Sequence, residues 1–205
     1  MDNSTIPNYS LFIQVLQKKI DGFFENQKEY MECHEGCGLC CKNAEFPFTE
    51  VEFQYLLNGF FKLNKKLQMN IMYRVEKIIQ DKKKFKEKNP DGKFLYDCPF
   101  LVDNKCSVYF FRGIVCRTFG LMSFDPNSDE KSKIPFCAFK GLNYSKVIEP
   151  ETKIVSEEKF KEFGYKEEPK AFNIKYKNLL DKDYEEGFGF KFGEAKTLIE
   201  WFEEA

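Results

Sequence analysis

The sequence lacks the charge excess that marks a partner of nucleic acid or of an anionic membrane. Its 32 basic residues almost balance its 33 acidic ones, which gives a net charge of −1. The positive surface field that polyanions select is therefore not expected. Glycine and proline are also modest, at 12 and 8 residues, and 42% of the chain is hydrophobic, which excludes a disordered or fibrous protein. A chain of 205 residues can bury a core without covalent cross-links.

Long apolar runs are missing as well. No segment approaches the length of a transmembrane helix, and the start of the sequence, MDNSTIPNYSLFIQVLQKKI, has no basic region followed by an uninterrupted apolar stretch. We therefore expect a cytoplasmic protein with no membrane partner and no nucleic-acid partner. Most cytoplasmic cysteines remain thiols, so eight of them favour metal or redox chemistry over the disulfide framework of an exported domain.

The apolar periodicity predicts a mainly α fold with minor β. It indicates a small helical domain around an irregular, cysteine-rich metal-binding core, with a C-terminal α/β extension. We interpret residues 1–205 as a single domain, with the core at 30–140 and the extension, 141–205, packed on it. Helices are expected at 8–31, after a capping box formed by Thr49 and Glu52, from Leu67 to about Phe85, at 107–118 and at 194–205. A hairpin or loop is expected at the CP and DNK turns that follow residue 97, and a strand or tight turn at 187–193. We interpret the basic run over residues 82–88 as a solvated face.

The cysteines fall into two groups. The first contains Cys33, Cys37, Cys40 and Cys41, and the second contains Cys98, Cys106, Cys116 and finally Cys137. A Cys-x-x-Cys turn, here with Gly36 and Gly38 to permit unusual dihedrals, lets two sulfurs converge on one ion. The adjacent Cys40 and Cys41 point in different directions, so they do not naturally share one ion. One of them could serve a second metal, bridge a binuclear site or remain a thiol for redox exchange. Two zinc ions, one [4Fe-4S] cluster with spare cysteines, and a mixed arrangement all stay open.

Three residues near the second group could support a cofactor. Arg112 and Arg117 flank Cys116, and on a helix Arg112 would lie one turn away, so a guanidinium can compensate thiolate charge. Tyr109 can close the apolar wall of the site or donate its hydroxyl. By contrast, Cys137 has an apolar setting and no nearby partner in sequence, which favours a structural core position. His34, the only histidine, is interpreted as a loop residue rather than a ligand.

Two stretches of sequence, CHEGCGLCCK at 33–42 and CPFLVDNKCSVYFFRGIVCRTF at 98–119, resemble a known family. They are similar to the motifs of the CxxCxxCC or YkgJ-like family of zinc- or iron-chelating cysteine-cluster domains. The resemblance covers residues 30–120 and implies that the metal-binding cysteines are Cys37, Cys40, Cys41, Cys98, Cys106 and Cys116, with Cys33 as a seventh. The same region is similar to part of the flagellin lysine N-methylases, which are associated with an iron–sulfur cluster and S-adenosylmethionine. No dinucleotide-type glycine loop is present.

The leading hypothesis is a metal-binding protein whose thiolates hold zinc or iron, with an iron–sulfur cluster as one form of the latter. Its role would be assembly, storage or structural support. The alternative is an iron–sulfur-dependent enzyme, either similar to a lysine N-methyltransferase or a thiol redox catalyst that uses Cys40 or Cys41. The sequence leaves the substrate, the reaction and any protein partner unassigned.

Overall fold

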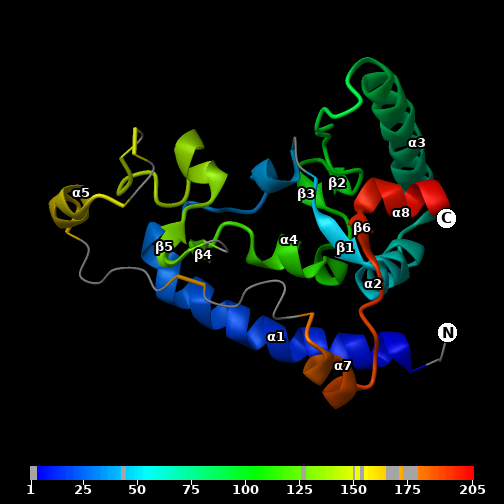
Figure 1. The fold of residues 1–205 in the computed structure, drawn as a ribbon, viewed down its shortest axis with the longest axis horizontal. Helices are drawn as coiled ribbons and strands as arrows, with labels where there is room; N and C mark the ends of the chain where they lie inside the picture. The colour runs from blue at the N-terminus through cyan, green and yellow to red at the C-terminus, as the bar shows by residue number, and fades with distance from the viewer. Residues whose placement is uncertain are drawn as a thin grey trace.

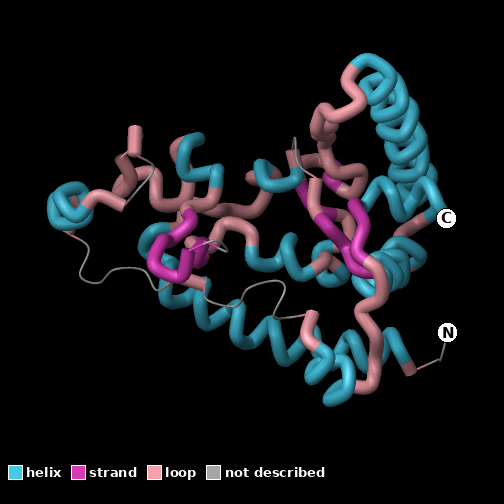
Figure 2. The backbone as a smooth tube through the Cα atoms, viewed as in Figure 1, coloured by secondary structure: helices cyan, strands magenta, loops and turns pink. Residues whose placement is uncertain are grey.

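The computed structural model describes residues 4–42, 45–125, 128–149, 151–152, 155–164, 171–172 and 180–205. Within these residues the fold is mainly α, and the strands occur only as short pairs (Figure 2). This confirms the predicted fold class. The described part of the chain contains no helix that combines the length and the apolar character needed to cross a membrane.

Three helices form the frame of the molecule. They are α1 (Thr5–Gln27), α2 (Glu50–Phe61) and α3 (Lys65–Lys88). The predicted capping box at the start of α2 is present: the Thr49 side chain accepts a hydrogen bond from the Glu52 backbone N–H, and the Glu52 side chain accepts one from the Thr49 backbone N–H. The α3 helix begins at its N-cap Asn64, whose side chain accepts a hydrogen bond from the Leu67 N–H, and ends before the predicted stop at 89–92. These local signals therefore place the helix ends close to where the sequence predicts them.

The second half of the chain is made of short elements. They are β2 (Leu101–Val102), β3 (Lys105–Cys106), α4 (Ile114–Thr118), β4 (Ser123–Asp125), β5 (Ser128–Lys133), α5 (Glu157–Glu162), α7 (Lys182–Phe188), β6 (Ala195–Thr197) and α8 (Leu198–Glu204). β2 pairs antiparallel with β3, and β4 with β5. A short strand that the sequence did not reveal, β1 (Pro47–Thr49), pairs antiparallel with β6. Residues far apart in the chain thereby meet beside α2 (Figure 1).

One prediction in this half is wrong in detail. The helix expected at 107–118 exists only as α4, because a 3-10 turn at Tyr109–Phe111 and the extended Arg112 come before it. At 187–193, where a strand or tight turn was expected, a turn forms: α7 ends at Phe188, Gly189 has a φ of 71°, and the Phe190 N–H donates to the carbonyl oxygen of Glu185 at 3.1 Å. The residues after this turn place Phe190 and Phe192 in the core.

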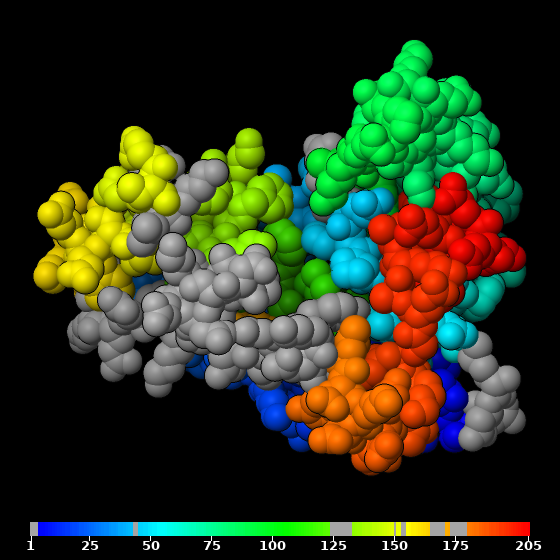
Figure 3. Space-filling view, in the orientation of Figure 1, coloured from blue at the N-terminus to red at the C-terminus, as the bar shows by residue number. Residues whose placement is uncertain are grey.

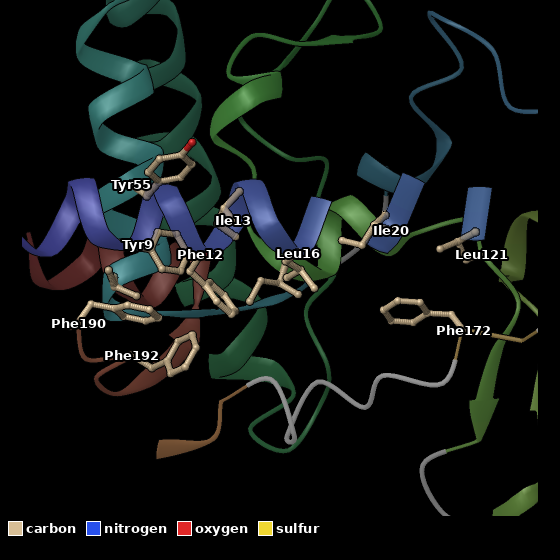
Figure 4. Close-up of a cluster of buried hydrophobic side chains, with 12 residues drawn as sticks. Tyr9, Phe12, Ile13, Leu16, Ile20, Tyr55, Leu121, Phe172, Phe190 and Phe192 are labelled. Carbon is tan, nitrogen blue, oxygen red and sulfur yellow. The ribbon is translucent and has the colours of Figure 1, made fainter. Parts of the chain in front are cut away.

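The largest core lies along α1. Its apolar face buries residues that include Tyr9, Phe12 and Leu16. The rings of Phe190 and Phe192 lie next to Phe12 with centroids 5.4 and 5.7 Å away (Figure 4). The C-terminal part of the chain thus covers the N-terminal helix.

The C-terminal helix α8 packs against α3 (Figure 3). Lys82 of α3 forms ion pairs with Glu203 at 2.8 Å and Glu200 at 3.7 Å. The indole N–H of Trp201 donates to the carbonyl oxygen of Phe48 at 2.8 Å, which links α8 to β1. The other lysines of the basic run, Lys83, Lys84, Lys86 and Lys88, are exposed, as predicted for a solvated face.

Candidate metal centre

The first cysteine motif folds as two consecutive tight turns. The Cys37 N–H donates to the carbonyl oxygen of His34 at 3.2 Å, and the Cys41 N–H donates to that of Gly38 at 3.0 Å. Gly36 and Gly38 adopt φ values of 85° and 58°, a region that disfavours residues with a Cβ atom. The predicted glycine-dependent turn is confirmed, and it directs several thiols to one side of the loop.

The second motif is built on the β2–β3 hairpin. Asp103 and Asn104 both have positive φ, 50° and 58°, as a two-residue type I′ turn requires. Cys98 precedes the hairpin and Cys106 ends it. The backbone N–H groups of Phe100 and Val108, each two residues after a cysteine, hydrogen-bond to these sulfurs and oppose the rise in their pKa. Such N–H···S bonds stabilise thiolates at metal sites.

Cys116 is presented by α4, whose start is fixed by a buried carboxylate. Glu52 is fully buried and accepts hydrogen bonds from the Thr49 N–H at 2.8 Å and from the Ile114 N–H at 2.7 Å. A Cβ atom at Gly113 would lie 2.7 Å from Phe48 and 3.1 Å from Glu52. Close packing therefore explains the glycine in front of α4, and the carboxylate ties the α4 N-terminus to α2.

The two motifs meet directly. The Cys98 N–H donates to the carbonyl oxygen of Cys41 at 2.7 Å. Arg74 of α3 donates to the carbonyl oxygen of Pro99 at 3.1 Å, and Lys105 pairs with Glu35 at 2.5 Å. A cavity of about 680 Å³ opens between the motifs. It is lined by all eight cysteines: Cys33, Cys37, Cys40, Cys41, Cys98, Cys106, Cys116 and Cys137.

Burial controls the protonation of most of these thiols. It raises the pKa of Cys98 to about 12, and it raises the pKa of Cys106 and of Cys116 as well. Cys40 is the exception: a hydrogen bond from the Cys41 thiol, 3.9 Å away, lowers the Cys40 pKa to about 7, and the charge of Arg112 acts in the same direction. The same contact, together with burial, raises the pKa of Cys41. Several thiolates can coexist here only if a cation compensates their charge.

The donor set suits a thiophilic metal. Among the residues that the structure describes, no three histidine, cysteine or acidic side chains already converge closely enough to hold a metal ion. The cavity wall nevertheless offers eight soft sulfur donors, supported by backbone N–H groups and an arginine. Such donors select zinc, iron or copper(I) over calcium or magnesium. Zinc or iron therefore fits the residues present.

The three residues predicted to support a cofactor, Arg112, Tyr109 and Arg117, differ in how close they lie to the thiols. Arg112 is outside α4, so it and Cys116 do not share a helix face, but its guanidinium still reaches the carbonyl oxygen of Cys116 at 3.4 Å. Its guanidinium carbon lies 3.5 Å from the centroid of the half-exposed Tyr109 ring. Arg117 is buried and donates to Gln17 at 2.8 Å, to the carbonyl oxygen of Arg112 at 2.9 Å and to that of Phe110 at 2.5 Å. These contacts make Arg117 a positioning residue that fixes the Arg112 backbone.

The sequence did not indicate that Cys137 belongs with the other cysteines. Cys137 is 3% exposed, in agreement with the predicted core position, but it also lines the cavity that the other seven cysteines line. Burial and, next, the Cys33 thiol raise the pKa of Cys137 to about 12. Only its residue type could have indicated its place at the cavity, because its flanking sequence contains no second cysteine.

His34 is exposed at the cavity rim. Its Nδ1 lies 3.0 Å from the carbonyl oxygen of Glu35, within hydrogen-bond distance. This agrees with the interpretation of His34 as a loop residue.

Comparisons with known proteins give one family. No curated protein and no solved structure matches the chain. A sequence model of the CxxCxxCC family, whose description is "Putative zinc- or iron-chelating domain", matches residues 32–138. That range includes all eight cysteines of the cavity and more than half of the chain. The protein therefore belongs to the CxxCxxCC family of zinc- or iron-chelating domains.

Proposed function

We propose that this protein holds zinc or iron through cysteine thiolates at the cavity between its two motifs. The observation that carries the proposal is that every cysteine of the chain lines this one cavity, although the cysteines come from segments far apart in sequence. The proposed ligands are drawn from Cys33, Cys37, Cys40, Cys41, Cys98, Cys106 and Cys116. A reducing compartment such as the cytoplasm would keep these thiols available.

The electrostatics of the cavity favour a cationic ligand. Burial favours the neutral thiols, so each bound thiolate requires an opposite charge nearby. A divalent ion supplies that charge, and the ligand protons are released when it binds. The N–H groups of Phe100 and Val108 and the guanidinium of Arg112 are placed to share the remaining negative charge. The chain itself therefore provides the donors, their orientation and part of the charge compensation.

Metal analysis of protein purified without oxygen tests the proposal. We expect sulfur-ligated zinc or iron in stoichiometric amounts. An iron–sulfur cluster would give a brown colour and acid-labile sulfide, whereas zinc would be colourless and free of sulfide. Protein that contains neither metal and takes up neither Zn²⁺ nor Fe²⁺ after reduction would refute the metal-binding function.

Arg112 offers a test of charge compensation. Its replacement, Arg112→Ala, is expected to weaken Zn²⁺ binding about fivefold, because a partly exposed charge near a thiolate contributes about 1 kcal/mol. Arg112→Lys should lose less, since the positive charge remains. Competition with a chelator at low and high salt measures the effect. A charge contribution shrinks at high salt. A loss that does not change with salt, or that is equal in both variants, would instead indicate that Arg112 acts through its hydrogen bonds to the carbonyl oxygens of Tyr109 and Cys116.

A further inference from the structure

The side chain of Asn143 joins three segments of the chain beside the cavity. It is fully buried, and its amide nitrogen donates to the Cys33 sulfur at 3.1 Å and to the carbonyl oxygen of Gly120 at 3.0 Å. Its amide oxygen accepts a hydrogen bond from the Glu32 N–H at 2.9 Å. The three partners lie 110, 23 and 111 positions away in the sequence. One amide therefore ties the start of the first cysteine motif to the residues that follow α4.

The surroundings of Asn143 hold its amide in this orientation. The N–H of the next residue, Tyr144, donates to the carbonyl oxygen of Tyr30 at 2.8 Å, and the two rings stack with centroids 5.9 Å apart. Gly120 adopts a φ of 99°, which favours glycine. A Cβ atom at Gly120 would lie 3.0 Å from the Asn143 amide nitrogen and 3.5 Å from the Cys33 sulfur. Glycine thus allows the amide to reach the sulfur, and the fixed backbone of Tyr144 keeps it there.

The acceptor that this buried amide uses is a sulfur atom. A buried N–H without a good acceptor costs free energy, and a neutral thiol is only a weak acceptor. A thiolate is a better one, because a hydrogen bond to an ionised acceptor is about twice as strong as one between neutral groups. Cys98 and Cys106, which line the same cavity, receive such N–H groups from the backbone. Cys33 receives its N–H group from the side chain of Asn143.

We propose that Asn143 is a positioning residue of the metal centre, whose amide N–H holds the Cys33 sulfur in place as a thiolate ligand. This inference rests on the proposed function and deepens it, since Asn143 lies beyond residues 32–138, the range that the family model matches. Cys33 lines the cavity but is an exposed residue, so its sulfur needs an anchor to stay over the cavity. Metal binding would then depend on the C-terminal part of the chain as well as on the cysteine motifs.

The zinc affinity of the reduced full-length chain tests this role. Asn143→Asp keeps the size of the side chain and the oxygen that accepts from Glu32, but it removes the N–H donors. We expect it to weaken Zn²⁺ binding about 10–100-fold in competition with a chelator, the usual effect of losing a residue that orients a ligand. Gln27→Glu is the matched control. Gln27 is also a fully buried amide, but it bonds to the backbone of Met122, so this variant should keep the zinc affinity of the wild-type chain.

A double-mutant cycle separates positioning of the sulfur from a general structural role. If the amide acts through the sulfur, Asn143→Asp should weaken zinc binding much less in a Cys33→Ala background than in the wild-type chain. Bound Co²⁺ gives a second readout, because its charge-transfer absorption increases with the number of bound thiolates. That absorption should fall by similar amounts in Asn143→Asp and Cys33→Ala, and it should stay unchanged in Gln27→Glu.

The outcomes separate this inference from the proposed function. A wild-type chain that takes up neither Zn²⁺ nor Co²⁺ contradicts metal binding itself, and the role of Asn143 falls with it. If the wild-type chain binds zinc, equal losses from Asn143→Asp in both backgrounds, or a loss no larger than that of Gln27→Glu, overturn the role of Asn143 and leave metal binding intact.

The wild-type chain decides the case in which Asn143→Asp does not fold. Loaded with an NMR-active isotope of Cd²⁺, it should show scalar coupling between the metal and a side-chain amide proton of Asn143, transmitted through the Cys33 sulfur. A chain that binds Cd²⁺ without this coupling refutes the inference.

Discussion

Removing the bound metal should lower the melting temperature by about 8–16 °C. Metal present at a thousandfold excess over its dissociation constant stabilises the folded state by about 4 kcal/mol. For a chain of this size, 1 kcal/mol corresponds to about 2–4 °C. The effect should be large because the metal would join two motifs separated by the whole of α2 and α3. Thermal unfolding with and without a chelator, under reducing conditions, measures the shift.

The part of the molecule that loses stability gives a second readout for metal removal. The core along α1 contains no cysteine. In the metal-free protein the amide protection of the β2–β3 hairpin should therefore be lost at a lower temperature than the helical signal of α1. Restoring Zn²⁺ should return the original melting temperature. An unchanged melting temperature after complete metal removal would show that the thiols do not link the motifs through a metal.

Glu52→Ala should destabilise the protein by about 3–5 kcal/mol, which corresponds to about 6–20 °C in melting temperature. The substitution deprives the buried N–H groups of Thr49 and Ile114 of their acceptor, and it leaves a cavity between α2 and α4. The α4 helix carries Cys116, so the same change should weaken zinc binding. Thermal unfolding and chelator competition on the same variant measure both effects.

The chain contains its own control for this experiment. Glu200 forms an equivalent capping box with Thr197 at the start of α8: its carboxylate accepts from the Thr197 N–H and hydroxyl, each at 2.8 Å, and its own N–H donates to that hydroxyl at 3.4 Å, but its side chain is 46% exposed. Glu200→Ala should therefore cost about 1 kcal/mol, the ordinary value of a helix cap, and should leave zinc binding unchanged. Equal losses in the two variants would mean that Glu52 acts only as a cap and that its bond to Ile114 contributes little.

Local signals in the sequence predicted much of the fold. The apolar spacing of α1, the Thr49–Glu52 capping box and the stop at 89–92 correspond to observed helix ends. The Asp103–Asn104 turn was also predictable, because two residues suited to positive φ lie between short apolar runs. Each of these features depends on residues within a few positions of one another, which is why a sequence pattern can reveal it.

The cysteine motifs were also predictable from sequence, but the full set of residues that line the cavity was not. The spacing around Cys37 and Cys40 and the family motifs point to thiolate chemistry without any structure. Cys137 has no motif, and Arg112 was expected on a helix that begins two residues after it. Cys137 was missed because the other cysteines of the cavity come from distant segments of the chain, whereas Arg112 contacts its near neighbours Tyr109 and Cys116 and only its predicted helical conformation is wrong.

The sequence by itself determined that the chain folds as helices and carries a thiol-rich family motif. The tertiary structure alone decided that β6 pairs with β1, that Glu52 holds the start of α4, and that the turn carrying Cys137 lines the same cavity as Cys33. Periodicity and capping report contacts between residues a few positions apart. These three arrangements join residues separated by dozens of positions, and burial of the aromatic cores brings them together.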